Sequence, residues 1–152
     1  MANNTVKALF ANPKHPPGQN VAEALGRSIK VVRSNPITHD AFDGDDTLTV
    51  FSVPANTFIY DIILEVVGAF GSGPSFKIGD GDDDDRFMDN TAFAGNTTGY
   101  KRITQDGQPG SQGYVYDTAD TIDITQAGTP TAGTANLWLF YLPNLTEWAL
   151  DS

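Results

Sequence analysis

The sequence predicts an all-β protein: a two-sheet antiparallel sandwich with an extended N-terminal arm, for which a jelly roll is the favoured topology. Roughly seven or eight short segments alternate apolar and polar side chains with the two-residue period of strands. No segment has a long helical pattern, and 15 glycines and 9 prolines supply turns. An immunoglobulin-like sandwich is the alternative, disfavoured because the cysteine and tryptophan landmarks of that fold are missing.

The chain is predicted to divide at residue 45, with the arm in residues 1–45 and the sandwich in residues 46–152. Three prolines between residues 11 and 19 remove backbone donors and favour extended geometry, so this part of the arm cannot sustain a helix. Residues 21–25 could form one helical turn. Residues 29–33 are a candidate short strand.

The longest predicted strand lies within Val53–Phe70, and the rest of the chain is expected to pack against it. β-Branched residues favour a strand over a helix here. The period of two predicts a core face and a mixed face. The predicted core face holds Tyr60, Ile62, Leu64 and Val66, and the mixed face holds Ile59, Asp61, Ile63, Glu65 and Val67.

The preceding segment, Thr47–Val53, also alternates, and Pro-Ala-Asn separates it from the long strand. This spacing predicts a hairpin between the two. A later segment, Ala135–Leu142, is apolar on both faces, which predicts a strand that is central or buried at an interface. The remaining predicted strands are residues 75–78, 99–103, 114–116 and 121–125.

The net charge of −10 is unevenly distributed. Up to Arg33, five basic residues face Glu23 alone, whereas 18 acidic residues follow. A basic arm on an acidic body suggests a negatively charged partner for the arm and solvent for the body; a weakly ordered tail with some lysines is the other interpretation. The body is a poor nucleic-acid ligand, because its charge repels phosphate.

Cysteine is absent, so neither disulfides nor thiolate metal sites can stabilise the fold. The first residues lack an apolar signal-peptide core, and no stretch approaches the roughly 20 apolar residues of a membrane helix. The sequence therefore predicts a soluble protein that is not exported by a signal peptide and has no membrane partner.

An acidic loop contains Asp80 and Asp82–Asp85, and carboxylates of this kind can bind Ca²⁺. The helix-loop-helix calcium pattern is not met, because Asp85 and Thr91 stand where it requires Gly and Glu. A solvated acidic turn without metal or cofactor is the favoured interpretation, with Asp80, Asp82 and Asp84 as candidate ligands. A second cluster could share an ion only if the two loops converge: Asp40, Asp43, Asp45 and Asp46.

No catalytic site is predicted. His15 and His39 are the only histidines, and both lie in irregular, proline-containing segments without a cysteine nucleophile. No pair of carboxylates stands out for glycoside hydrolysis. Aromatic residues could form a sugar-stacking platform, although on alternating strands they more often make core or subunit contacts. These aromatics are Tyr100, Tyr114, Tyr116, Trp138, Tyr141 and Trp148.

The last two-thirds of the chain resemble small proteins encoded among the head genes of tailed bacteriophages. The resemblance rests on a Val-Pro-Ala turn, a long strand, an Ile-Gly-Asp-Gly-Asp segment and an Arg-Phe pair, followed by a later group in the same order. The first group is Val53–Ala55, Ile59–Phe70, Ile78–Asp82 and Arg86 with Phe87, and the later group is Tyr116, Ala119–Thr125, Thr131–Gly133 and a strand ending at Tyr141. Residues 1–45 have no counterpart.

This resemblance implies a capsid decoration, or cement, protein without enzymatic activity. Such modules are commonly trimeric, bind the outer surface of the phage head and bridge neighbouring major capsid protein subunits, so both that protein and further copies of this chain are expected partners, with a trimer favoured over a dimer. The basic arm would lie on the capsid through Lys7, Phe10, Lys14, Arg27, Lys30 and Arg33. A carbohydrate- or receptor-binding fibre sandwich is the alternative, and a small hydrolase is a third, less favoured one.

Overall fold

The computed structural model describes residues 28–42, 47–71, 74–89, 95–102 and 108–145. Short strands and two 3₁₀ helices make up the regular structure of these residues. The strands are β1 (Lys30–Arg33), β2 (Ile37–Thr38), β3 (Thr47–Val53), β4 (Thr57–Gly68), β5 (Ser75–Gly79), β6 (Gly99–Arg102), β7 (Tyr114–Tyr116), β8 (Asp120–Ala127) and β9 (Thr134–Leu142). The 3₁₀ helices are η1 (His39–Ala41) and η3 (Pro109–Gln112).

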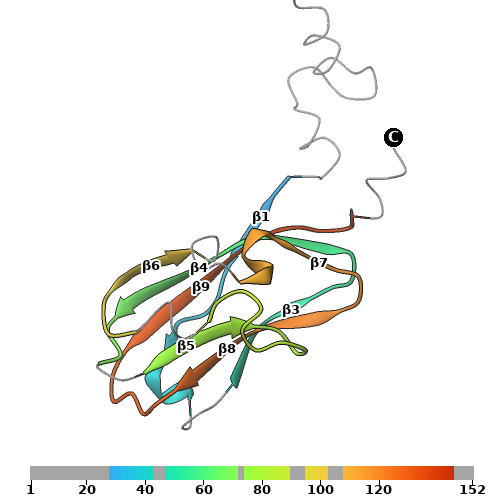
Figure 1. Cartoon of the computed structure of the whole chain (residues 1–152). Helices are drawn as coiled ribbons and strands as arrows, with labels where there is room; N and C mark the ends of the chain where they lie inside the picture. The colour runs from blue at the N-terminus through green and yellow to red at the C-terminus, as the bar shows by residue number, and fades with distance from the viewer. Residues whose placement is uncertain (1–27, 43–46, 72–73, 90–94, 103–107, 146–152) are drawn as a thin grey trace, which may run out of the picture.

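The strands form two antiparallel sheets. The larger has the order β1-β9-β4-β6, with β2 beside β9 and β7 beside β4. The smaller has the order β3-β8-β5. The two sheets lie one over the other in Figure 1. The predicted two-sheet antiparallel sandwich is therefore confirmed, and its connections are consistent with a jelly roll.

The core lies between the sheets and takes side chains from both. Phe70 and Phe76 meet edge to face, with ring centroids 4.9 Å apart. Aromatic pairs in this geometry add stabilisation beyond the apolar area they bury. The largest fully buried side chains are Ile59, Ile62, Leu64, Phe70, Phe76, Ile78, Phe87, Met88, Ile122, Ile124 and Leu137.

A β-bulge at Tyr60 corrects the predicted faces of β4. Ile59 pairs with Tyr141, but Asp61 pairs with Phe140, so Tyr60 is an extra residue in the strand. The bulge shifts the alternation, and Ile59 is fully buried whereas Tyr60 is 48% exposed. The prediction was therefore wrong for these two residues. It is confirmed for the residues after the bulge, since Ile62, Leu64 and Val66 face the core.

The predicted β3–β4 hairpin is wrong, because β3 pairs with β8 in the smaller sheet. The turn carries the chain across to the larger sheet through Asn56, which has a left-handed φ of 60°. The Asn56 N–H donates to the Tyr116 carbonyl at 2.6 Å, and its carbonyl accepts from the Leu145 N–H at 2.9 Å. Alternation shows which face of a strand is buried, but it does not identify the strand's partner.

Strand β9 is central, one of the two placements predicted for it, and lies between β1 and β4. Residues 30–33 and 37–38 pair with it, and the Ser34 N–H donates to the Leu137 carbonyl at 2.8 Å. The short strand predicted at residues 29–33 is thus confirmed as β1. The helical turn predicted at residues 21–25 lies outside the described residues. Among the described residues, no helix is long and apolar enough to cross a membrane.

The start of β1 and the end of β9 lie at the same end of the sandwich, because Lys30 pairs with Tyr141. Figure 1 shows both at the top of the molecule. The β8–β9 connection, residues 128–133, lies at the opposite end, since β9 begins there at Thr134. The described chain thus enters and leaves the sandwich at one end.

Candidate functional site

The outer face of the larger sheet, the one pointing away from the smaller sheet, is largely apolar. Strand register assigns its residues, because side chains paired across neighbouring strands point to the same side. Val31 pairs with Phe140, which lies beside Asp61 of β4. We call this surface the apolar face; register assigns to it the apolar residues Val31, Phe58, Ile63, Tyr100, Val115, Trp138, Phe140 and Leu142, and we include the exposed bulge residue Tyr60 beside them.

Several of these side chains remain open to solvent. Tyr100 is 71% exposed, Val31 53%, Tyr60 48% and Val115 45%. An antiparallel sheet whose outer face meets only water carries mainly polar residues there. A run of exposed aromatic and β-branched side chains is instead typical of surfaces that contact another molecule.

Two arginines of this surface already have partners within the chain. The buried carboxylate of Asp61 accepts from the Arg102 Nε at 2.9 Å, and it also binds Nη2 of the same guanidinium. The Arg33 guanidinium lies 5.6 Å from the ring centroid of Trp138, within cation–π range. These pairings lower the cost of removing the charges from water when a partner covers the sheet.

Glu65 is the other acidic residue of the apolar face, and three donors surround it. Its carboxylate accepts from Trp138 Nε1 at 2.9 Å, Asn136 Nδ2 at 3.0 Å and the Tyr100 hydroxyl at 3.1 Å. The hydrogen bonds from Trp138 and Asn136 hold the pKa of Glu65 below its usual range. The donors also fix the two aromatic rings in place beside the carboxylate.

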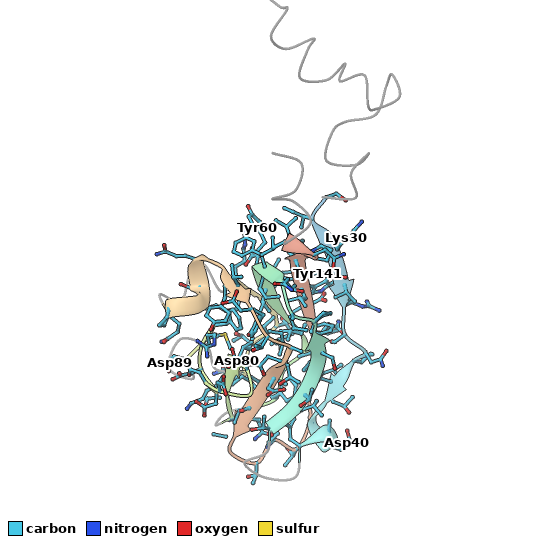
Figure 2. The ribbon with its side chains drawn as sticks, turned by 90° about the vertical axis from the view of Figure 1, so that its right-hand side faces the viewer. Lys30, Asp40, Tyr60, Asp80, Asp89 and Tyr141 are labelled. Carbon is cyan, nitrogen blue, oxygen red and sulfur yellow. The ribbon has the colours of Figure 1, made fainter. Side chains whose placement is uncertain are left out.

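An apolar groove of about 370 Å³ opens between the sheets at the end where β1 begins. Figure 2 labels Lys30, Tyr60 and Tyr141 at this end, with Asp40 at the other. Inward-facing residues of the larger sheet and residues of β3 line it, so the groove lies on the side of that sheet opposite the apolar face. Its apolar lining consists of Val32, Phe51, Val53, Pro54, Ile59, Leu139, Tyr141 and Pro143.

The outer face of the smaller sheet has the opposite character. Thr47 and Thr125 face each other there and share a hydroxyl hydrogen bond of 2.8 Å. The loop of residues 80–85 adds carboxylates beside this sheet. We call this surface the acidic face; it comprises the loop and Thr47, Thr49, Ser52, Lys77, Thr121, Asp123 and Thr125.

Asp80 organises the acidic loop. Its Oδ1 accepts the backbone N–H groups of Asp82 at 3.1 Å and Asp83 at 2.9 Å, while Oδ2 accepts the Tyr116 hydroxyl at 2.7 Å. Arg86 binds both carboxylate oxygens. Burial raises the pKa of Asp80, but the hydrogen bonds from Arg86 and Tyr116 outweigh it and leave that pKa below its usual value.

The same network acts on the neighbouring aromatic residues. Burial, followed by the hydrogen bond to Asp80, raises the pKa of Tyr116 well above its ordinary value. The Arg86 guanidinium lies 4.4 Å from the Tyr114 ring centroid. Gly79 is required where the loop begins, because a Cβ there would lie 2.0 Å from the Asp83 carbonyl oxygen. The buried carboxylate of Asp80 thus holds the acidic loop in a defined conformation.

The sequence-predicted capsid-binding residues fall into two groups. Lys30 and Arg33 lie on β1 at the edge of the larger sheet, and Arg33 belongs to the apolar face. The other four lie outside the described residues: Lys7, Phe10, Lys14 and Arg27.

The candidate metal ligands Asp80, Asp82 and Asp84 do line one hollow. Of the second acidic cluster, Asp40 lies in η1, and Asp43, Asp45 and Asp46 are outside the described residues. Among the histidines, His39 is in η1, whereas His15 also lies outside them.

The predicted aromatic residues do not converge on one surface. Tyr114 and Tyr116 pack near Phe87 and the acidic loop, whereas Tyr141 lines the groove. Tyr100 and Trp138 share the apolar face, where they bind Glu65. Trp148 lies outside the described residues. This arrangement fits the interpretation as core and contact residues better than a sugar-stacking platform.

Sequence reasoning did not single out Val31, Ile63 and Phe140 as members of one surface, nor Asp123 as part of the acidic face. The available signal was Ala135–Leu142, whose two apolar faces predicted a strand that is central or at an interface. That strand is central, and its outward side chains lie on the apolar face.

No protein-family model matches this chain, and no curated protein matches its sequence. Its fold is similar to solved chains from three phage capsids. A chain of the Cyanophage Pam1 capsid asymmetric unit has a TM-score of 0.58 at 18% identity, covering 84% of this chain and 90% of that one.

A chain of the acidic stable capsid structure of Helicobacter pylori bacteriophage KHP30 has a TM-score of 0.55 at 15% identity, covering 78% of this chain and 91% of that one. A chain of the capsid of Ralstonia phage GP4 has a TM-score of 0.53 at 22% identity, covering 77% of this chain and 85% of that one. At these identities the likeness shows the fold. The chain thus shares its sandwich fold, over most of its length, with chains in phage capsid structures.

Proposed function

We propose that this chain is a structural virion protein that binds the outer surface of a phage head and bridges neighbouring major capsid protein subunits. The contrast between the two outer faces of the sandwich carries the proposal. One face presents exposed aromatic and β-branched side chains whose charged neighbours are already paired, and the other presents carboxylates and hydroxyls. The fold shared with chains of phage capsid structures supports the same class of function.

The apolar face would dock on the capsid. A stable protein interface buries about 800 Å² on each partner, and aromatic residues often dominate its energy. Tyr60, Tyr100 and Trp138 would supply such anchors. The acidic face would remain in solvent, where like charges on neighbouring copies discourage aggregation. The protein would thereby stabilise the head through contact area alone, without a catalytic step, a nucleic-acid partner or a membrane partner.

The N-terminal arm, residues 1–45, would extend this contact along the shell. Strands β1 and β2 would anchor its last part on β9, leaving residues 1–27 to reach neighbouring subunits. An extended segment of that length spans at most roughly 90 Å. Lys7, Phe10, Lys14 and Arg27 would contact the capsid from the arm, and Lys30 and Arg33 would contact it from β1.

Light scattering combined with cosedimentation tests this function. The purified chain is expected to form a small homo-oligomer, a trimer rather than a dimer, and to saturate heads stripped of bound copies at a fixed stoichiometry. Raised salt should weaken attachment, because the basic arm contributes through charge. A monomer that stays in the supernatant with such heads would contradict the proposal, and a glycan array would then test the fibre-type alternative.

A further inference from the structure

A hollow of about 450 Å³ lies between the acidic loop and the smaller sheet. Asp80, Asp82, Asp83 and Asp84 line it from the loop, and Asp123 lines it from β8. The loop therefore does more than project into solvent. Its carboxylates line the same hollow as a carboxylate of β8, the central strand of the smaller sheet.

Asp123 is the unusual residue of this group. It is only 7% exposed, and it pairs across the sheet with Thr49 on one side and Gly79 on the other. Its Oδ2 accepts the Thr121 hydroxyl at 3.0 Å, but its buried Oδ1 has no hydrogen-bond partner among the described residues. An unpartnered buried carboxylate oxygen is costly, and a bound ion can satisfy it.

The surrounding carboxylates are crowded. Oxygens of Asp83, Asp84 and Asp85 lie within 4.8 Å of one another. Lys77 pairs with Asp84 at 3.0 Å, and Arg86 approaches Asp83 only at 4.0 Å. Carboxylates this close together repel one another. Further positive charge would relieve this repulsion.

We propose that this hollow binds a hard divalent cation of the calcium class, with Asp123 as its innermost ligand and Asp82, Asp83 and Asp84 as ligands from the loop. Oxygen ligands in an irregular, open arrangement suit Ca²⁺, which takes 6 to 8 of them, better than Mg²⁺, which demands near-octahedral geometry. Asp80 is not a ligand, because Arg86, Tyr116 and two backbone N–H groups occupy its oxygens. The ion would tie the loop to the central strand.

Calorimetric titration of the full chain with CaCl₂, after removal of divalent ions, tests the site. One Ca²⁺ per chain is expected to bind with a Kd of about 10⁻⁴ M, the range of extracellular calcium modules. Calcium at 100 times Kd should raise Tm by roughly 5 to 10 °C. Equal concentrations of MgCl₂, at matched ionic strength, should give a much smaller shift.

The Asp123→Asn variant separates a ligand from a merely structural residue. Because the substitution removes an unpaired buried charge, the variant should melt at or above the wild-type temperature without calcium and lose the calcium-induced shift. Asp117→Asn, at an exposed position that does not line the hollow, removes one charge and should keep the full shift. The proposal is overturned if the wild-type chain shows no saturable calcium binding, or if Asp123→Asn binds calcium as the wild type does.

Discussion

The two outer faces of the sandwich are built on the same alternation of side chains, yet they differ in almost every other respect. On the larger sheet, the outward positions hold valine, phenylalanine, isoleucine and tryptophan, and the arginines among them are paired. On the smaller sheet, the outward positions hold threonine, serine and aspartate, beside a loop rich in carboxylates. The inward positions of both sheets are mainly apolar.

The difference teaches where to look for function in a β-sandwich. The inward residues specify the fold, and they would look the same in a protein with any other function. The outward residues are free of that requirement, so an apolar outward row needs a separate reason. Here the apolar face and the acidic face give one molecule a surface suited to protein contact and another suited to solvent and cations.

Replacing Asp80 by alanine should have the largest effect on stability. It would show that the acidic face depends on this buried carboxylate for its structure. The change leaves Arg86, Tyr116 and two backbone N–H groups without their buried acceptor. We expect the free energy of unfolding, measured with urea, to fall by about 3 to 5 kcal/mol. In calcium-free buffer, Asp82→Ala, at an exposed neighbouring position, should change it by less than about 0.5 kcal/mol. Equal losses in the two variants would contradict this role of Asp80.

Deleting residues 1–27 tests whether the apolar face suffices for attachment without the basic arm. Cosedimentation with heads should show at least a hundredfold loss of affinity, about 2.7 kcal/mol. The Tm should stay unchanged, since strands β1 to β9 all lie beyond the deletion. Undiminished attachment would assign binding to the sandwich alone and remove the arm from the proposed function.

Placing a charge on the apolar face should weaken attachment without unfolding the protein. Val31→Glu alters an edge-strand side chain that is 53% exposed, and it would bury a carboxylate in the capsid interface. Head affinity should fall about tenfold or more, roughly 1.4 kcal/mol. Thr118→Glu, in the exposed turn before β8, is the matched control and should bind normally. If both variants bind equally well, the apolar face is not the contact surface.

The stability that Asp80 contributes on the acidic face should depend on pH, and this effect should be smaller than those above. Because the folded-state pKa of Asp80 is depressed, its stabilisation is complete above the ordinary value of about 3.9 and is lost as pH falls through the lower folded-state value. The stability difference between wild type and Asp80→Asn should therefore shrink below about pH 4. Urea unfolding of both proteins between neutral and acidic pH measures it. A difference independent of pH would mean that the charge of Asp80 does not contribute.

Much of the fold could be predicted from local patterns. The predicted strands at residues 75–78, 114–116 and 121–125 nearly coincide with β5, β7 and β8, because alternation and turn residues are local properties. Two features were not local. Tyr60 looked like a core residue until the bulge shifted its strand, and β3 paired with β8 rather than with its neighbour in sequence.

The candidate site was less accessible to sequence reasoning. The apolar face combines Val31, Ile63 and Phe140 from three strands, so it exists only once the order β1-β9-β4 is known. Asp123 lies in a strand where alternation places it outside, and only the loop that closes over it makes it buried. Long-range pairing and loop placement determined both features, and neither leaves a periodic signal in the sequence.

Because the described chain enters and leaves at one end of the sandwich, the opposite end offers a site for engineering. The loop of residues 128–133 turns there between two glycines with positive φ, Gly128 and Gly133. A guest peptide inserted in this loop would project away from both chain exits and interrupt no strand. On an assembled shell, each bound copy could then carry a foreign epitope or a small enzyme, at a spacing set by the lattice beneath it.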